Sequence, residues 1–463
     1  MGVDREESRG AREAPRGELD ELVGRLKADG RAIIHVGIFD TFGTFRERRL
    51  ALDDLARVYG PGGTFVNVLP LWDAGESVFD AGPFVGEAVA LDPGSARPYP
   101  FEDDAALLIA DYAGPSAAFS PRQLLKAQIE KARALGFGVR AALEFEFFVL
   151  EEDAASLRES GFMRLAAFAR DNRCWAGESA AGHAGFVREL REALDLGGVK
   201  LLSLGLELGP GCFEATLRAQ DPLRAADDAA VFKMFTKAFC RRRGLTAAFM
   251  AQLAADLAGL SGHVHLSLHE LASGRPVFPE AGAPDGMSAS FRHFVAGIVR
   301  LAPEALALTH HNVNSYRRHA PGNWAPKTAS WAVQNYSVGV RVVPAPDDAA
   351  RLEYRLPGAD VNPYLGLAFT IGAGLWGLET RAELPQAFLG GGPNEMPPSG
   401  SGGEVPLPHD LFEAAERLGR SKAAREIFGD TFVDHYARVC RVEEAALRRA
   451  TGAPERARYL EVV

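Results

Sequence analysis

Residues 141–150 read AALEFEFFVL, an apolar run that carries two carboxylates, Glu144 and Glu146. Side chains two residues apart in a β-strand point to the same face, so the two carboxylates project together. Solvated charges rarely sit inside so apolar a run, because a surface strand alternates with polar residues. The stretch therefore predicts a buried strand that presents two acids to a functional site.

Three further stretches place acids or imidazoles in the same way: Glu207 through Glu214, His263-Val264-His265 and Glu353-Tyr354-Arg355. Each is predicted to lie on a strand of its own, with His263 and His265 sharing a face. Carboxylates crowded on one face repel each other strongly unless cations lie between them. Hard oxygen ligands with an imidazole favour Mg²⁺ or Mn²⁺ over zinc or copper. The pattern indicates metal-assisted phosphoryl chemistry.

Composition narrows the class of protein. The chain has 463 residues, which is long enough for two domains or for one large domain with an appendage. Its 47% hydrophobic and 24% charged residues are typical of a globular protein. Its net charge of −10 argues against a nucleic-acid partner. Its four cysteines lack CxxC spacing and are typical of reduced thiols. The N-terminus has no apolar signal core, and no uncharged apolar run reaches the ~20 residues of a membrane span. We expect a cytoplasmic protein with no membrane partner.

The order of predicted elements indicates two domains, residues 17–113 and 114–463, after a disordered tail over residues 1–16. The smaller domain is expected to be α+β, with two strands joined by a turn at Asp40-Thr41-Phe42-Gly43. The other expected elements are helices over 19–26, 222–243, 288–308 and 408–450, a helix from Ser120 to about Leu135, strands over 32–39 and 44–50, and a surface loop over 390–406.

Two patterns are set aside. Gly372, Gly374 and Gly377 match the spacing of a dinucleotide-binding loop, but they lie in an apolar, helix-like run with no strand immediately before it. A close contact between helices is the better interpretation. His310 and His311 follow a predicted helix and are expected to be a solvated or capping pair.

Motifs in order along nearly the whole chain resemble those of the glutamine synthetase family. They are Asp40-Thr41-Phe42-Gly43, the strand of Glu144 and Glu146, Phe249-Met250, Ser261-Gly262-His263-Val264-His265-Leu266-Ser267, Asn314-Ser315-Tyr316-Arg317-Arg318, Pro321-Gly322 with Ala325-Pro326, Asn335 to Val342, Arg351-Leu352-Glu353-Tyr354-Arg355 and Asn362-Pro363-Tyr364-Leu365. Any one of them could arise by chance, whereas all of them in the family's order are a specific signal.

The resemblance implies an α+β architecture: an N-terminal β-grasp domain followed by a glutamine synthetase-type α/β catalytic domain. It also implies a homo-oligomer of stacked rings, a double-ring dodecamer, with active sites between neighbouring subunits. Asp40 of one chain would then complete the amine pocket of the next.

The resemblance further implies two divalent ions, Mg²⁺ or Mn²⁺, and ATP as co-substrate. Glu146, Glu207 and Glu214 would hold one ion. Glu144, His263 and Glu353 would hold the other, which bridges to the nucleotide phosphates. Five carboxylates and one imidazole are a plausible charge balance for two such ions.

The remaining implied site residues bind substrates. Arg318, Arg341 and Arg355 match arginines for the acid substrate and the phosphate, which Arg can bind at two points. His265 and Gly262 would lie near the nucleotide and the acid. The expected catalytic residues are Asp40, Arg318 and Arg355.

This chain departs from the family mainly where the amine would bind. The family's flap motif PGxEAP has Trp324 in place of the glutamate, and indole can neither accept a proton nor balance the charge of ammonium. Its face can hold an organic cation. In addition, Cys212 replaces Gln or His near the acid substrate, Tyr336 replaces an arginine, and Ala251-Gln252-Leu253 replaces Pro-Lys-Pro.

An intact metal shell beside an altered amine pocket favours an ATP-dependent ligase that joins the γ-carboxylate of glutamate to an organic amine through an acyl phosphate. One alternative is an ammonia-using glutamine synthetase, which loss of the flap acid disfavours. The other is a non-catalytic oligomeric family member, which retention of six metal ligands and three arginines disfavours. The sequence does not identify the amine. It does not identify the acid either, because Cys212 alters the pocket in which the acid would bind.

Overall fold

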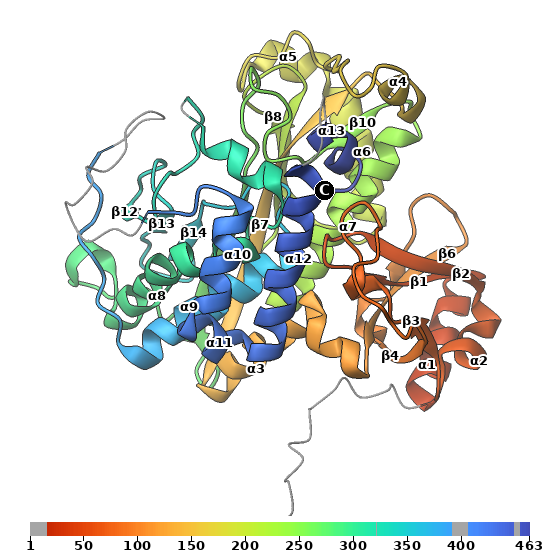
Figure 1. Cartoon of the computed structure of the whole chain (residues 1–463), viewed down its shortest axis with the longest axis horizontal. Helices are drawn as coiled ribbons and strands as arrows, with labels where there is room; N and C mark the ends of the chain where they lie inside the picture. Colours follow the sequence, from red (N-terminus) through yellow and green to blue (C-terminus); the bar gives the residue numbers. More distant parts are fainter. Residues whose placement is uncertain (1–15, 321, 391–405, 449–453) are drawn as a thin grey trace, which may run out of the picture.

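The structure, a computed structural model, describes residues 16–320, 322–390, 406–448 and 454–463. The predicted disordered tail and the loop predicted over 390–406 lie almost entirely outside the described residues. Figure 1 shows a smaller N-terminal part beside a larger body that is built around a second sheet. In the part of the chain that is described, no helix combines the length and apolar character needed to cross a bilayer.

The N-terminal part is a six-stranded mixed sheet with two α-helices. Its strand order is β2-β1-β6-β4-β3, with β5 beside β6, and only the β1–β6 pair is parallel among the described pairs. Leu19, Leu22 and Leu26 lie at helical spacing and share one apolar cluster with the strand residues Ile34 and Leu108. The elements are α1 (Arg16–Ala28), β1 (Ile33–Phe39), β2 (Phe45–Ala51), α2 (Leu55–Tyr59), β3 (Thr64–Val66), β4 (Gly86–Leu91), β5 (Arg97–Pro98) and β6 (Ala105–Tyr112).

The larger body contains an eight-stranded sheet in the order β12-β13-β14-β11-β7-β9-β8, with β10 beside β7. β7 is its longest strand and runs antiparallel to β9, β10 and β11. The strands are β7 (Phe137–Leu150), β8 (Leu201–Leu206), β9 (Cys212–Leu217), β10 (Thr246–Ala248), β11 (Gly262–Glu270), β12 (Trp331–Val333), β13 (Val340–Val343) and β14 (Arg351–Tyr354). The predicted strand of Glu144 and Glu146 is thus confirmed.

Helices and short 3-10 turns surround this sheet. Those predicted after Ser120 and over 222–243, 288–308 and 408–450 are confirmed within a few residues. The Ser120 hydroxyl accepts a hydrogen bond from Gln123 N and caps the first of them, as expected. The helices are α3 (Pro121–Ala134), α4 (Ala154–Glu159), α5 (Gly177–Gly182), α6 (Ala184–Leu196), α7 (Pro222–Arg241), α8 (Ala289–Ala305), α9 (Pro363–Thr380), α10 (Leu411–Arg420), α11 (Lys422–Phe428), α12 (Asp430–Arg448) and α13 (Pro454–Tyr459).

The two faces of β7 have different surroundings. Phe145 and Phe147 are fully buried and pack against Phe232 of α7 and Phe249, with ring centroids 5.2 to 6.4 Å apart. Glu144 and Glu146, on the opposite face, are only half-buried. One face of the sheet therefore forms the core against α7, and the other is free to form a site.

The glycine pattern set aside as a close helix contact lies in α9, where Gly374 and Gly377 face α8 and Gly372 faces Ile427 of α11 and Gln128 of α3. A Cβ on Gly377 would come within 2.2 Å of His293 O and 2.7 Å of Gly297 Cα, and one on Gly374 within 2.1 Å of the Phe294 ring. The two helix backbones touch, so the interpretation as a packing motif is confirmed.

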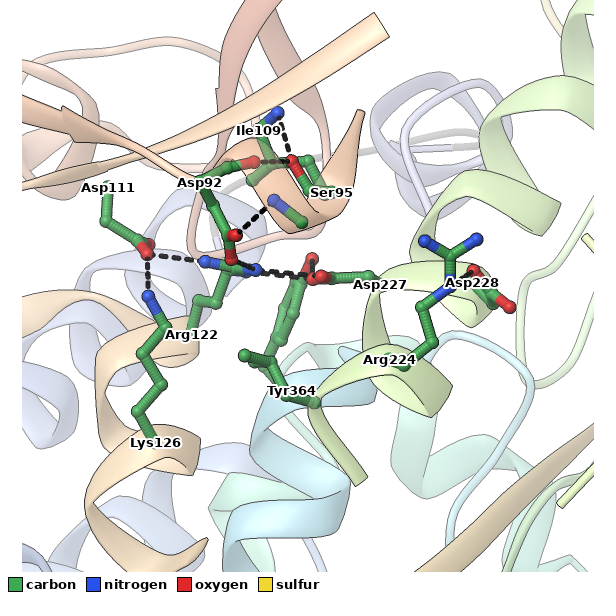
Figure 2. A network of polar contacts seen from close by, with 12 residues as sticks. Asp92, Ser95, Ile109, Asp111, Arg122, Lys126, Arg224, Asp227, Asp228 and Tyr364 are labelled. Atoms are coloured by element: carbon green, nitrogen blue, oxygen red, sulfur yellow. Dashed lines mark hydrogen bonds and ion pairs between the residues drawn. The ribbon is translucent and has the colours of Figure 1, made fainter. Parts of the chain in front are cut away.

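A buried polar network joins the two parts of the chain, and Figure 2 shows its arrangement. The Arg122 guanidinium of α3 contacts Asp92 (2.5 Å) and Asp111 (2.6 Å) of the N-terminal part and Asp227 of α7 (2.8 Å). Tyr364 of α9 donates to the same Asp227 at 2.8 Å. Below we call this network the Arg122 junction. It fixes the N-terminal sheet against three helices of the larger body.

Candidate active site

Strand register gathers the predicted residues on one face of the large sheet. Directly opposed residues of neighbouring antiparallel strands lie on the same face. Across β7, β9 and β11, Glu146 is opposite Glu214, and Glu144 is opposite both Thr216 and His263. Farther along the sheet, His265 is opposite Glu353, which is opposite Arg341. We call this surface the acidic face.

One group of ligands centres on Glu144 and Glu353. The His263 Nδ1 atom lies 3.0 Å from Glu144 Oε1 and 3.3 Å from Glu353 Oε1. Atoms of Glu144, His265 and Glu353 that could bind a metal also lie within 4.8 Å of one another. We expected His265 near the nucleotide and acid, and its Nε2, 3.8 Å from Glu144 Oε2, places it beside this carboxylate group as well.

A second group contains Glu146, Glu207 and Glu214. Glu214 lies in β9, whereas Glu207 follows β8 by one residue, so our prediction that 207–214 forms one strand was wrong: it comprises a turn and the start of the returning strand. Ser261 N donates to Glu146 Oε2 at 2.7 Å. Burial and the neighbouring carboxylates raise the pKa of Glu214 to about 9. Such repulsion is what a bound cation would relieve.

The donor set fits divalent cations. Within the described chain, His263 Nε2 and both ring nitrogens of His265 are buried without a hydrogen-bond partner. Burial lowers the pKa of His263 to about 4, so this imidazole is neutral at physiological pH, as a metal ligand must be. Unpartnered imidazole nitrogens beside five crowded carboxylates match the ligands of Mg²⁺ or Mn²⁺.

Three predicted arginines border the acidic face. Arg341 Nη1 lies 2.7 Å from Glu353 Oε2, and the Arg355 guanidinium pairs with the other oxygen of the same carboxylate. The Tyr336 ring stacks 3.9 Å from the Arg341 guanidinium, and its hydroxyl accepts from Nη2 at 3.0 Å. Arg318 is buried and donates to Leu356 O at 2.9 Å; burial lowers its pKa to about 10.

Gly262 makes a close backbone approach. A Cβ there would come within 2.4 Å of Gly358 O, so β11 could not lie beside residue 358 with a larger residue. This close contact is enough to account for a glycine at position 262, whether or not a ligand binds there. Its predicted place near the substrates stays a prediction.

Asp40 lies in the N-terminal part, away from the residues gathered on the acidic face. Its Oδ1 accepts from Phe42 N (3.0 Å) and Thr44 N (2.9 Å), and its Oδ2 accepts from Arg46 Nε (2.8 Å). Burial raises the pKa of this carboxyl. Asp40 therefore shapes the turn between β1 and β2, and its role in an amine pocket stays a prediction.

The flap carries Trp324 on its surface. Asn323 Nδ2 donates to Gln252 Oε1 (2.7 Å) and to Arg318 O (2.9 Å), which ties this segment to the site arginine. The Trp324 side chain is 52% exposed. Its neighbour Pro321 lies outside the described residues. An indole on an anchored but open segment is available to a substrate.

Sequence reasoning missed two contacts of the acidic face. Trp175 Nε1 donates to Glu207 Oε2 at 2.6 Å, and Thr216 Oγ1 donates to Glu144 Oε2 at 2.8 Å. Thr216 follows Glu214 by two residues on β9, so the period of the strand could have found it. No spacing links Trp175 to the acids.

The prediction for His310 and His311 was wrong. Both are buried rather than solvated, and His310 Nε2 lies 2.8 Å from His319 Nε2. The segment after α8 turns inward under the 3-10 helix Val313–His319 that carries Arg318. His310 therefore contacts the turn that carries Arg318, whereas the His311 ring contacts Phe42 of the N-terminal part.

Comparisons with known proteins show to which family a chain with this fold and site belongs. Residues 118–459 match the family model described as "Glutamine synthetase, catalytic domain". The glutamate–isopropylamine ligase of a Pseudomonas species is 33% identical over 441 residues, 93% of this chain and 95% of that protein. The gamma-glutamylethanolamide synthetase of Streptomyces coelicolor is 32% identical over 375 residues, 80% of this chain and 77% of that protein.

Solved structures agree with these matches. The structure described as "Apo GmaS without ligand" has a TM-score of 0.81 and 25% identity, covering 94% of this chain and 98% of that one. Fold, acidic face and relatives together define the class, an ATP-dependent ligase that joins an acid to an amine. The chain belongs to the glutamine synthetase family, on its γ-glutamyl-amine ligase branch.

Proposed function

We propose that this protein converts glutamate, ATP and an organic amine into a γ-glutamyl amide, ADP and phosphate. The observation that carries the proposal is the combination of a complete acidic face with an exposed indole, Trp324, on the flap. The first supplies the means to activate a carboxylate, and the second changes the surface that the amine meets. One relative is named for isopropylamine, the amine that it joins to glutamate, and another for its γ-glutamylethanolamide product, and both names support the choice of an organic amine.

The chemistry has two steps. A γ-carboxylate oxygen of glutamate attacks the terminal phosphorus of ATP, and the bond to ADP breaks, which leaves an acyl phosphate. The amine nitrogen then attacks the acyl carbon, phosphate departs, and the nitrogen gives up a proton. Arg341 and Arg355 meet at Glu353, where they could bind the phosphate oxygens that carry charge in both steps.

The acidic face provides the ligands for two divalent cations. Glu146, Glu207 and Glu214 would hold one, and Glu144, His263 and Glu353 the other, with Mg²⁺ or Mn²⁺ as the ions that suit this donor set. When bound, these ions neutralise the oxygens of the transferring phosphoryl group.

The amine pocket lacks the charge that ammonium needs. Ammonium is small and strongly hydrated, and its desolvation must be offset by nearby negative charge. Trp324 adds apolar and π-rich surface instead. A cation–π contact contributes roughly 0.5–2 kcal/mol, enough to bias selection a few- to about thirtyfold toward an amine with a hydrocarbon body.

We also infer the wider organisation. The mixed sheet with α1 and α2 is proposed as a β-grasp domain over residues 17–113, and residues 114–463 as the catalytic domain. The buried residues of the smaller apolar cluster all lie between Leu19 and Tyr112, which supports the division, while Phe39 and Leu107 of the same sheet belong to the larger cluster. Asp40 is proposed to complete the amine pocket of a neighbouring chain in a double-ring homo-oligomer. Its carboxylate contacts Phe42, Thr44 and Arg46 and no residue of the acidic face of the same chain. In the neighbouring pocket it would take the proton from the attacking nitrogen.

The test is phosphate release with glutamate, ATP and either ammonium, alkylamines or diamines. We expect the parent to prefer an organic amine, and Trp324→Glu to shift preference toward ammonium. Trp324→Phe retains an aromatic face and serves as the matched control that keeps the parent's preference. Glu146→Ala, which removes a proposed metal ligand, should abolish turnover with every amine. A parent that prefers ammonium, with no change in Trp324→Glu, would contradict the proposal.

A further inference from the structure

A cavity of about 380 Å³, separate from the acidic face, lies between the N-terminal domain and α7. Its walls are the turn Phe42–Phe45, the pair Tyr99 and Phe101, one side of α7, and residues 461–462. Figure 1 shows the N-terminal domain beside α7 and the end of the chain. Among the described residues that line the cavity, none belongs to the acidic face. Its volume is in the range of small-molecule sites, which are common where domains meet.

The α7 side of the cavity is positively charged. Lys233, Lys237 and Arg241 follow one another at four-residue spacing, so they lie on one side of the helix, and Arg242 is next to them. Among the described lining residues, Glu461 is the one acid, and it already contacts Arg241 (3.5 Å) and Arg158 (2.7 Å). The cations therefore outnumber the acids.

Neither lysine forms an ion pair with a carboxylate among the described residues; both donate to backbone carbonyl oxygens instead. Lys233 Nζ donates to Ala359 O at 2.9 Å, and Lys237 Nζ donates to Val462 O at 2.7 Å. Burial lowers the pKa of Lys237 well below its usual range, and repulsion from Lys233 and Arg241 adds to the effect. An anion in the cavity would supply the missing negative charge.

The other wall is aromatic. Phe42, Phe45, Tyr99 and Phe101 line it, and the Arg242 guanidinium lies 5.7 Å from the Phe101 ring. An inorganic ion would leave most of this volume unfilled and the rings without contact. A cationic helix that faces aromatic rings is complementary to a ligand with one anionic end and one apolar or planar end.

We propose that this cavity binds a small organic anion, a phosphate or carboxylate joined to an aromatic body, with Lys237 and Arg242 facing the anionic end. The site also reaches Asp40, because Phe42 and Thr44, which line the cavity, donate their backbone N–H groups to Asp40 Oδ1. Ligand packed against this turn would hold Asp40 in place. That consequence rests on the function proposed above; the binding itself does not.

The experiment measures binding of phenyl phosphate to the full-length assembled protein by calorimetry, with Mg²⁺ and ADP at saturation so that the nucleotide site is filled. We expect saturable binding, at least tenfold weaker for inorganic phosphate or phenol alone. Lys237→Met and Arg242→Gln should each weaken it about tenfold or more. Arg242 is exposed, so its replacement leaves the core intact.

Arg243→Gln is the matched control. Arg243 is adjacent in sequence, but it stacks on Phe239 at 3.6 Å and pairs with Glu189 at 2.8 Å rather than lining the cavity. Its replacement should leave binding unchanged. The proposal is overturned by an absence of saturable binding, by binding that is seen without ADP but is lost when ADP is saturating, by equal losses in Arg242→Gln and Arg243→Gln, or by binding only after the assembly dissociates. None of these outcomes depends on ligase activity, so failure of the proposed function is seen separately.

Discussion

Glu207 differs from the other proposed acidic ligands because its hydrogen-bond partner, Trp175, lies outside the sheet. Its carboxylate accepts from the Trp175 indole N–H at 2.6 Å and lies 3.5 Å from the Cys174 sulfur. The Trp175 side chain is 78% exposed, and its backbone has a φ of 56°, in the left-handed region that non-glycine residues rarely adopt. A strained backbone conformation costs free energy, and packing of the exposed ring does not offset that cost. We therefore attribute the conformation to the hydrogen bond that the indole donates to Glu207.

We therefore expect Trp175→Phe to weaken divalent-ion binding. Removing the hydrogen-bond partner of a ligand typically costs 10–100-fold in metal affinity, because the carboxylate is no longer oriented. Mn²⁺ titration followed by electron paramagnetic resonance measures the loss directly. Trp324→Phe, at an exposed indole on the flap, is the control. Equal affinities in the parent and Trp175→Phe would show that the indole does not orient Glu207.

The residues of the acidic face differ in how far sequence predicts them. The two-residue period of a strand inside apolar sequence is enough to predict Glu144, Glu146, His263 and His265. Trp175 becomes a neighbour of Glu207 only through tertiary folding, which local patterns do not encode. His310 was assigned to the surface for the same reason: the stretch after α8 gives no sign that it turns into the core.

At the scale of elements, β7 and its neighbours were predictable because the polar residues on one face alternate with buried aromatics on the other. The hairpin between β8 and β9 was not predicted, because Glu207 through Glu214 was interpreted as one strand although Gly209-Pro210-Gly211 carries turn chemistry. The glycines of α9 were interpreted correctly, since an apolar helical run without a preceding strand leaves helix packing as their main role.

The α8–α9 contact predicts the effect of filling a glycine. In Gly377→Ala the new methyl group would lie 2.2 Å from His293 O, so the helices must separate, and overpacking of this kind typically costs about 1–3 kcal/mol. Gly419→Ala in α10 is the control, because its methyl group would meet Ala437 Cβ at an ordinary 3.9 Å. Alanine favours a helix over glycine by roughly 0.5–1 kcal/mol, so this variant should be neutral or stabilised. Urea unfolding distinguishes the two, and equal midpoints would contradict the contact.

At the scale of the whole molecule, we expect the Arg122 junction to hold the N-terminal part and the larger body together as one unit. Arg122→Met would leave Asp111 and Asp227 buried with reduced or no compensation, and uncompensated buried charge typically costs about 3–5 kcal/mol. The control is Arg133→Met on the same helix, which breaks an exposed pair with Glu130 and should change little. Denaturant unfolding monitored in both domains is the measurement. A loss no larger than that of the control would exclude the junction as a stabilising element.

Charge crowding on the acidic face predicts a pH dependence that metal removes. The pKa of Glu214 is raised to about 9 in the folded protein, so the native state binds this proton more tightly than the unfolded chain. Stability of the metal-free protein should then fall as pH rises toward 9. Histidines with lowered pKa values, such as His263 at about 4, act in the opposite direction only below about pH 6.5, and Lys233, lowered to about 8, acts so above about pH 8. Burial also lowers the pKa of Lys237, which opposes the trend equally in the metal-bound protein and in Glu214→Gln, so comparison with these two isolates the effect of Glu214.

Between about pH 6.5 and 8 we therefore expect the Tm to fall with rising pH in EDTA, and to fall much less with saturating Mg²⁺. Calorimetric scans in both conditions make the comparison. Glu214→Gln carries no titrating group and should show the flatter dependence even in EDTA. A metal-free Tm that rises across this window would contradict the crowding argument.

The proposed sharing of each active site between two chains can be tested with two variants that we expect to be inactive on their own. Asp40→Asn keeps an oxygen that accepts from Phe42 N and Thr44 N, so the turn between β1 and β2 survives while the carboxylate is lost. Arg355→Ala removes a guanidinium that pairs with Glu353 on the acidic face. If each site combines the catalytic domain of one chain with Asp40 of the next, every site in either homogeneous ring lacks one group.

Rings reassembled from equal amounts of the two variants should regain activity, because a site with the catalytic domain of Asp40→Asn and the turn of Arg355→Ala is complete. Random mixing makes about one quarter of the sites complete in a head-to-tail ring. Phosphate release after dissociation and reassembly measures the gain, with each variant reassembled alone as the control. Mixed rings that form but stay inactive, or an Asp40→Asn enzyme as active as the parent, would place the proton acceptor elsewhere in the molecule.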